Sequence, residues 1–404
     1  MSVDKRAAGR MKILHTEAST GWGGQEIRIL NEAVGMIARG HQVELACPAD
    51  ARICIEAPRR GVPVHALPIG RKNLRGLSAM RRFLRTHWYD VINTHSSTDS
   101  WLVALASIGL RGGNGDTRDT ASAGTAGQRG PRGPPPLVRT RHISALVPGN
   151  AATRWLYTHA STHVVTTGES LREQLIRDNG LDPHRVTSVP TGIDPSRFPP
   201  TDDAIRALRR IELSLDPRTA LVGIVATLRS WKGHRYLIDA IADLDDDTVR
   251  LAIIGDGPQR AALEQQVAAR KLEDRIVFAG NRDDVSPWLQ AFDVFALPSY
   301  ANEGVPQALL QAMFTGLPCV TTDAGAISEI AIDGTTALVV EREDPVTLAA
   351  ALARLLADAS LRQQLGSAAR AHVLERHSLA GMLDRMESIF ASAMSGPAPG
   401  RRAR

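Results

Sequence analysis

A chain of 404 residues is long enough to hold two domains, and a single hydrophobic core of that size would be unusual. Hydrophobic residues make up 43% and charged residues 23%, which is typical of a soluble globular protein, and no run approaches the roughly 18 to 20 apolar residues that a membrane span needs. The formal net charge of +5 permits an anionic substrate or surface, and we expect no nucleic-acid partner.

The cysteine content and the N-terminus both favour a cytoplasmic location. Cys47, Cys54 and Cys319 lack the spacing of a metal site and form an odd set, so we expect reduced thiols. The first ten residues carry charges but no apolar signal core, and we expect them to be a disordered lead.

The first predicted elements form a βαβ unit with a glycine-rich turn. The elements are a strand at 11–15, a loop at 16–24, a helix at 25–39 and a strand at 42–47. Gly23 and Gly24 stand where the loop enters the helix, and small residues there let the backbone approach a phosphate closely. The loop lacks the G-x-G-x-x-G pattern, which disfavours a dinucleotide-dependent oxidoreductase.

The rest of the N-terminal half repeats this alternation. Further strands are predicted at 62–67, 89–94, 137–140, 164–166 and 186–189, and the Gly- and Pro-rich segment 111–136 is predicted to be a flexible surface insertion. His95 follows one of these strands, and Arg139 and His142 end the next. Ligands of doubly wound sheets gather at such carboxyl edges. His95 therefore either reaches a ligand or is a hydrogen-bonded structural histidine, and Arg139 or His142 could face an acceptor or a phosphate.

A Pro-rich run at residues 195–200 predicts a linker to a second domain. Beyond it, strands at 221–226, 250–254 and 276–279 alternate with helices near 234–242, 259–271 and 285–291. The alternation in both halves predicts an α/β protein with two doubly wound parallel sheets.

The stretch from residue 298 to residue 330 has the strongest chemical signal. A helix is predicted to begin just after Val305, so the N–H groups of Gly304 and Val305 should point out of its positive end, which suits an anion or a sugar hydroxyl. Glu303 can accept hydrogen bonds from a polyol, and Gln311 lies further along the same helix.

This stretch resembles the signature of the retaining glycosyltransferases of family 4, whose pattern is Glu, seven residues, Glu, then A-M-A-x-G-x-P-V-V and G-G-x-x-E. Glu303 occupies the first position, Gln311 replaces the second Glu, and Glu329 ends the pattern. The turn Gly23-Gly24-Gln25-Glu26 also resembles the family's G-G-x-E loop, and residues 191–198 resemble its N-G-V-D-x-x-x-F segment.

The resemblance covers residues 11 to about 395 and implies the GT-B architecture, with two Rossmann-like domains facing each other across a cleft. It implies an N-terminal acceptor-side domain over 11–196, a C-terminal nucleotide-sugar-binding domain over 197–378, a helix over 379–395 that crosses back to the first domain, and a disordered tail over 396–404.

The resemblance also implies roles for individual residues. Lys232 and Arg229 would neutralise the departing diphosphate, although the family's Arg position is Thr227 here. Glu303 would hold sugar hydroxyls and favour positive charge at the anomeric carbon, and His95 would reach the donor sugar. The donor-binding residues would be Gly23, Gly24, Asp256, Arg282, Gly304, Val305 and Gln311, and the acceptor-side residues Gln25, Arg139 and His142.

Metal and cofactor requirements follow from the same residues. Asp245 to Asp247 has a D-x-D spacing, but the run also reads as the exposed end of a helix. With Lys232 and Arg229 available for the diphosphate, we expect no metal and no cofactor beyond the nucleoside-diphosphate sugar itself.

The acceptor is addressed by the N-terminal half. Residues 71–85 mix basic and apolar groups at helical spacing, so they either lie against anionic lipid or form a surface helix whose apolar face is core. The motifs together most resemble the lipopolysaccharide-core and cell-surface glycan branch. We expect a retaining hexosyltransferase with a lipid-linked or polysaccharide acceptor, peripheral to the inner face of the cytoplasmic membrane. The alternatives are a catalytically weakened nucleotide-sugar-binding protein and a nucleotide-sugar epimerase of the same architecture.

Overall fold

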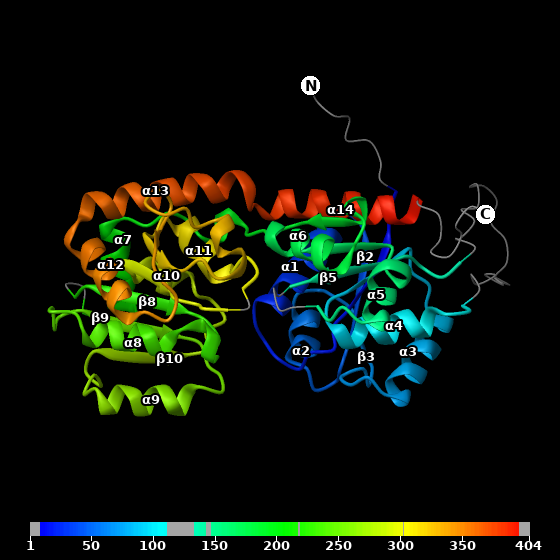
Figure 1. Cartoon of the computed structure of the whole chain (residues 1–404), viewed down its shortest axis with the longest axis horizontal. Helices are drawn as coiled ribbons and strands as arrows, with labels where there is room; N and C mark the ends of the chain where they lie inside the picture. Colours follow the sequence, from blue (N-terminus) through cyan, green and yellow to red (C-terminus); the bar gives the residue numbers. More distant parts are fainter. Residues whose placement is uncertain (1–8, 111–132, 143–146, 217–218, 302, 396–404) are drawn as a thin grey trace, which may run out of the picture.

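The computed structural model describes residues 9–110, 133–142, 147–216, 219–301 and 303–395. The predicted lead up to residue 8, most of the predicted insertion (111–132) and the predicted tail (396–404) lie outside the described residues. Two α/β domains lie side by side, and α13 and α14 run one after the other along the same side of both (Figure 1).

The N-terminal domain is built on a seven-stranded parallel sheet with the order β3-β2-β1-β4-β5-β6-β7. Its strands are β1 Lys12–Thr16, β2 Gln42–Cys47, β3 Val64–Ala66, β4 Val91–Thr94, β5 Leu137–Arg141, β6 His163–Thr166 and β7 Val186–Ser188. Its helices are α1 Gly24–Ala38, α2 Arg52–Arg59, α3 Leu74–Thr86, α4 Ser97–Ser107, α5 Ala151–Trp155 and α6 Glu169–Asn179.

The C-terminal domain is built on a six-stranded parallel sheet with the order β10-β9-β8-β11-β12-β13. Its strands are β8 Leu221–Val225, β9 Arg250–Ile254, β10 Ile276–Gly280, β11 Val294–Leu297, β12 Cys319–Thr321 and β13 Leu338–Val339. Its helices are α7 Asp203–Glu212, α8 His234–Ala242, α9 Arg260–Ala269, α10 Ser286–Ala291, α11 Gln307–Thr315, α12 Pro345–Ala357 and α13 Ala359–Arg376. The two sheets confirm the predicted fold class.

The strand sequences explain why both sheets are covered on their two faces. β8, β9 and β11 are almost continuous apolar runs, as expected of parallel strands that helices cover on both sides, and they are buried along nearly their whole length. Order reverses at β1/β4 in the first sheet and at β8/β11 in the second, and ligands of open α/β sheets bind at such switch points.

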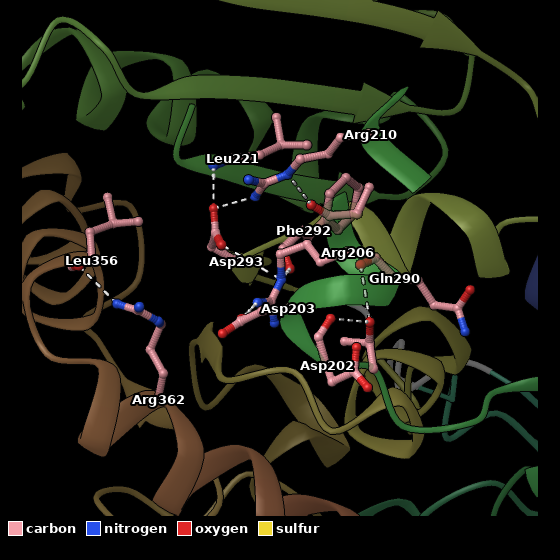
Figure 2. A network of polar contacts seen from close by, with 12 residues as sticks. Asp202, Asp203, Arg206, Arg210, Leu221, Gln290, Phe292, Asp293, Leu356 and Arg362 are labelled. Atoms are coloured by element: carbon pink, nitrogen blue, oxygen red, sulfur yellow. Dashed lines mark hydrogen bonds and ion pairs between the residues drawn. The ribbon is translucent and has the colours of Figure 1, made fainter. Parts of the chain in front are cut away.

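An arginine network fastens α7 to the amino edge of the second sheet (Figure 2). Arg210 donates to Asp293 Oδ2 at 2.5 Å, and the same oxygen accepts from the backbone N–H of Leu221 at 2.7 Å. Arg206 donates to the carbonyl of Phe292 at 3.1 Å. These contacts lie at the strand starts, opposite the carboxyl edge, so their role is to hold the domain together.

The chain crosses between the domains twice, and the two crossings touch each other. The N–H of Ile193 donates to the carbonyl of His377 at 2.9 Å, and the N–H of Leu379 donates back to the carbonyl of Ile193 at 2.8 Å. After the second crossing, α14 (Leu379–Ser395) lies against α1 in the N-terminal domain, where Arg39 and Glu387 form an ion pair at 2.8 Å. The crossings therefore form a junction in which the two linking segments are hydrogen-bonded to each other.

Candidate active site between the two domains

The carboxyl edges of the two sheets meet in direct contact. Gln307, in the first turn of α11, donates its amide to the carbonyl of Gly24 at 2.8 Å. Gly304 lies so close to the first domain that a Cβ there would be 2.7 Å from the carbonyl oxygen of His142 and 2.5 Å from Thr167 Oγ1. Gly23 faces Thr227, just after β8, less closely: a Cβ there would be 3.8 Å from Thr227 Oγ1. The structure is thus a closed arrangement in which the glycine turn opposes the start of α11.

Lys232 and Glu303 form an ion pair where the carboxyl edges of the two sheets meet. Lys232 Nζ donates to Glu303 Oε1 at 2.6 Å, and the Glu303 side chain is only 6% exposed. Lys232 comes from the turn after β8 and Glu303 from the loop after β11, so adjacent strands of the sheet bring the two together. Gly233 allows the turn because its φ is +75° and a Cβ there would meet the carbonyl oxygen of Pro298.

Three histidines form a continuous hydrogen-bonded chain at the carboxyl edge of the first sheet. His15 Nδ1 lies 2.8 Å from His95 Nε2, and His95 Nδ1 lies 2.9 Å from His142 Nε2. Burial lowers the pKa of His15 to about 3 and lowers the pKa of His95 and of His142 well below the usual value, so all three rings are neutral. His95 is 4% exposed and both of its ring nitrogens bond to the other two histidines, whereas His142 is half-buried and its backbone carbonyl lies against Gly304.

A buried carboxyl group, that of Glu17, lies next to the glycine turn. Glu17 accepts from the backbone N–H of Ser19 at 2.7 Å and from the amide of Gln25, so the predicted acceptor-side residue Gln25 is bonded within its own loop. Burial raises the pKa of Glu17 to about 8, and the nearby Asp99 adds to the rise. Arg139 is likewise buried at this edge, with its guanidinium carbon 4.7 Å from the centre of the Tyr157 ring.

The other predicted donor-side residues lie around the rim of the second sheet. Arg229 is exposed and covers the Trp231 ring at 5.3 Å. Asp256 is exposed and accepts from the N–H of Gly257 at 2.7 Å. Arg282 covers Trp288 at 5.7 Å, and both line a hollow of about 560 Å³.

Val305 and Gln311 flank the beginning of α11. Val305 is 5% exposed, so only its backbone can serve a ligand. Pro306 is the N-cap residue and the helix begins at Gln307, one residue later than a proline in the first turn would give. Gln311 is half-buried on the second turn, and its carbonyl accepts from Thr315.

A second contact between the domains involves the last glutamate of the motif. Glu329 lies at the end of a short 3₁₀ helix, Gly325–Glu329. Its carboxylate accepts from the backbone N–H groups of Glu169 and Ser170 at 2.8 and 2.9 Å, at the start of α6. It therefore caps a helix of the opposite domain.

Sequence reasoning missed several members of the site. Glu329, Gln307, His15 and Glu32 were given no role. The sequence did contain a signal for His15. It lies near the end of β1, as His95 lies just after β4, and neighbouring parallel strands present such residues at one edge. The contacts of Glu329 and Gln307 cross between domains, and no local pattern reports them.

Within the described residues, no group of three or more His, Cys, Asp or Glu side chains is placed to hold a metal ion. In the D-x-D run, Asp246 caps Thr248 at 2.8 Å and Asp247 pairs with Arg275 at 3.1 Å. None of the described helices is both long and apolar enough to cross a bilayer.

Comparisons with known proteins agree with this geometry. Residues 23–192 match the model of the glycosyl transferase 4-like domain, and residues 219–358 match that of glycosyl transferases group 1. A D-inositol 3-phosphate glycosyltransferase of Corynebacterium aurimucosum is 31% identical over 293 residues, 67% of this chain and 69% of the relative. The similar Streptomyces bingchenggensis enzyme is 28% identical over 251 residues, 59% of this chain and 54% of its own length.

Two further similarities extend the comparison. The lipopolysaccharide core biosynthesis mannosyltransferase LpsB of Rhizobium meliloti is 34% identical over 181 residues, 43% of this chain and 51% of the relative. The crystal structure of Anabaena HepE in complex with UDP and glucose has the same fold, with a TM-score of 0.79, 22% identity and coverage of 95% of this chain and 100% of that chain. The chain therefore belongs to the GT-B glycosyltransferases, with a glycosyl transferase 4-like N-terminal domain and a group 1 C-terminal domain.

Proposed function

We propose that the protein transfers a hexose from a nucleoside-diphosphate sugar with retention of configuration and without a metal ion. The observation that carries this proposal is the Lys232–Glu303 pair at 2.6 Å, at a sheet switch point and opposite the Gly23-Gly24 turn. Such a pair places a cation for the diphosphate and a carboxylate for the sugar within hydrogen-bond distance of each other.

The donor diphosphate would replace Glu303 as the partner of Lys232. Lys232 then neutralises the leaving group, which bears about two to three negative charges, while the N–H groups at the glycine turn and at the start of α11 bind phosphate or sugar oxygens. Glu303, released from Lys232, accepts hydrogen bonds from sugar hydroxyls and stabilises positive charge at the anomeric carbon. The acceptor hydroxyl attacks the anomeric carbon from the face that the diphosphate leaves and gives its proton to the departing phosphate oxygen, so no covalent enzyme intermediate is needed.

Two substitutions within the motif bear on donor affinity. The amide of Gln311 can donate and accept, so it can bind a ribose hydroxyl without the negative charge of a glutamate. Thr227 cannot supply a guanidinium, and Arg229 must leave its stacked position on Trp231 to do so. We expect both residues to weaken donor binding and to leave the type of reaction unchanged.

Two acceptor classes are supported by different observations. The resemblance to the lipopolysaccharide-core branch and the similarity to LpsB support a lipid-linked or polysaccharide acceptor. The relatives from Corynebacterium aurimucosum and Streptomyces bingchenggensis are D-inositol 3-phosphate glycosyltransferases, which supports a phosphorylated polyol. Nucleotide release measured with 1D-myo-inositol 3-phosphate and with a detergent-solubilised glycolipid extract separates the two classes.

A peripheral membrane contact is part of the first alternative. Met80 and Phe83 on α3 are buried, so most of its apolar face packs into the core. Leu74, at the start of α3, is 83% exposed among the exposed basic residues Arg71 and Lys72. Sedimentation with anionic vesicles at low salt tests this contact, and equal recovery with neutral vesicles would contradict it.

The first experiment is thermal stabilisation by UDP, GDP, ADP, CMP and dTDP, with and without EDTA. A ligand present at 100 times its dissociation constant stabilises the folded state by about 2.7 kcal/mol. Stabilisation by one nucleoside diphosphate in EDTA, together with sugar transfer, supports the proposal. Binding without turnover would indicate the weakened binder, and interconversion of nucleotide sugars without an acceptor would indicate the epimerase.

A further inference from the structure

The histidine chain, His15, His95 and His142, runs from the interior of the first domain to the part of its carboxyl edge that faces the second domain. Its members come from β1, β4 and β5, which are neighbours in the sheet and end at the same edge. The rings of His15 and His95 are 5.1 Å apart and those of His95 and His142 are 5.2 Å apart. The two hydrogen bonds therefore form one continuous path from a fully buried ring to a half-buried ring.

The inner end of the path meets a buried carboxyl group. Glu32 on α1 is fully buried and accepts from the amide of Asn93 at 3.2 Å. Its Oε1 lies 3.9 Å from His15 Nε2, which is longer than a hydrogen bond but within the range of a direct ionic contact. His15 Nε2, Glu32 Oε2 and two nitrogens of the buried Arg28 make no hydrogen bond within the described part of the chain. These polar atoms need water or one another.

The outer end of the path lies where the two domains touch. The backbone carbonyl oxygen of His142 lies against Gly304, whose neighbour Glu303 holds Lys232. The Nε2 atom of His142 is bonded to His95, which leaves Nδ1 as the nitrogen available to a ligand. A change at Glu32 can therefore reach Nδ1 of His142 through two hydrogen bonds.

The direction of these bonds has two states. A neutral imidazole has one donor and one acceptor nitrogen, so each ring that accepts from one neighbour must donate to the other. With Glu32 ionised, His15 directs its Nε2–H toward the carboxylate, every bond points inward, and Nδ1 of His142 is an acceptor. With Glu32 protonated, every bond is reversed and Nδ1 of His142 carries the proton.

We propose that Glu32 is a positioning residue for sugar transfer, because it sets the tautomer of His142 through His15 and His95. This inference rests on the proposed function. The inward direction is the active one, since an accepting nitrogen at this edge of the sheet favours the positive charge that develops at the anomeric carbon. An N–H group at that place would oppose the same charge.

Groups on every neighbouring element bear on the ionisation of Glu32 and the histidine chain. Burial raises the pKa of Glu32 to about 7, against the opposing effects of Arg28 and Asn93, so its ionisation changes near neutral pH. The other charged groups around the path are Arg139 on β5, Asp99 on α4 and Arg385 on α14. Glu32 is the member of this set that is placed at the end of the path.

The test is ¹⁵N NMR of the histidine side chains in the full-length protein without substrate. Imidazole ¹⁵N shifts distinguish the two tautomers, and His142→Gln assigns the signal among the 12 histidines. We expect His142 to change from the Nδ1–H form at pH 6 to the Nε2–H form at pH 8. In Glu32→Gln, whose amide can donate to His15, the Nδ1–H form should persist at both pH values.

Glu44→Gln is the matched control. Glu44, on β2, bonds to His65 and Tyr89, outside the histidine chain. The substitution should leave the tautomer of His142 and the pH profile as in the wild type. In assays, Glu32→Gln should lower kcat about tenfold or more, with a smaller change in KM, and should remove the rise of kcat through pH 7.

Two outcomes decide the inference. An identical His142 tautomer in the wild type and in Glu32→Gln at both pH values would overturn it. If Glu32→Gln does not fold, His15→Gln breaks the path at its first link, and a pH-dependent His142 tautomer in that variant would overturn it equally. Because NMR needs no turnover, a tautomer change in a protein without transferase activity would refute the proposed function alone.

Discussion

The carboxylate of Glu329 accepts a hydrogen bond from the backbone N–H of Ser170 at 2.9 Å, and this bond joins the two domains. The same carboxylate accepts from the preceding N–H group, so the C-terminal domain supplies the N-cap of α6. The cap requires the two domains to be in contact. Glu329 is therefore a latch between the domains, separate from the crossings at Ile193.

Glu329→Ala should favour the open arrangement. Loss of a charged N-cap costs about 1–2 kcal/mol, which corresponds to a shift of about 5- to 30-fold in the closed-to-open ratio. We expect a larger radius of gyration by small-angle X-ray scattering and a higher KM for the donor. Glu375→Ala, at an exposed position on α13, is the control. Unchanged scattering would show that the latch contributes nothing to closure.

Lys232→Ala should lower turnover by about 100-fold or more, because a preorganised charge at the leaving group is lost. Arg235→Ala removes an exposed cation three residues away and should leave the rate within about twofold of the wild type. The measurement is nucleotide release at saturating donor. A Lys232→Ala enzyme of normal rate would show that the diphosphate is neutralised elsewhere.

Glu303→Gln should separate binding from catalysis. The amide keeps the shape of the side chain and can still contact sugar hydroxyls, but it no longer stabilises positive charge. It also frees Lys232 from its ion pair. We expect nucleotide binding by calorimetry to persist while transfer falls by about 100-fold. Full activity would remove Glu303 from the mechanism.

The folded state should be most stable at about pH 6.5. Burial lowers the pKa of six histidines, so the unfolded chain binds more protons below about 6.5 and stability is lost as the pH falls. These are His15, His95, His142, His163, His234 and His377. Burial raises the pKa of Glu17 to about 8 and that of Glu32 to about 7, so their contribution is lost as the pH rises through those values.

Melting temperatures between pH 4.5 and pH 9 measure the loss of stability on the acidic and on the alkaline side of the maximum. Glu32→Gln should flatten the alkaline side, because its amide does not ionise, and should leave the acidic side in place. A monotonic rise of the melting temperature with pH would contradict the predicted maximum.

Gly233→Ala should destabilise the second domain more than Gly334→Ala. Both glycines have positive φ, +75° and +65°, so both substitutions strain the backbone. Only at Gly233 does a Cβ also meet a backbone atom, the carbonyl oxygen of Pro298, while the space around Gly334 is open. Chemical denaturation measures the difference. Equal losses would show that the turn carrying Lys232 can move aside.

The sequence alone determined the fold class. Strand runs alternating with amphipathic helices specify parallel sheets because each segment reports its own burial. Glu303 and Lys232 were predicted as site residues from the family resemblance. Their ion pair follows from the adjacency of β8 and β11, because loops at the carboxyl ends of adjacent parallel strands share one edge.

The tertiary structure decided which other groups these residues meet. His95 could be placed at the sheet edge from sequence, but its position between His15 and His142 depends on the strand order β1-β4-β5. The cap by Glu329 and the contact of Gln307 with Gly24 depend on how the two domains close. Periodicity and motif spacing describe one segment at a time, whereas hydrogen bonds between distant segments are set by packing, and the latch and the histidine chain consist of such bonds.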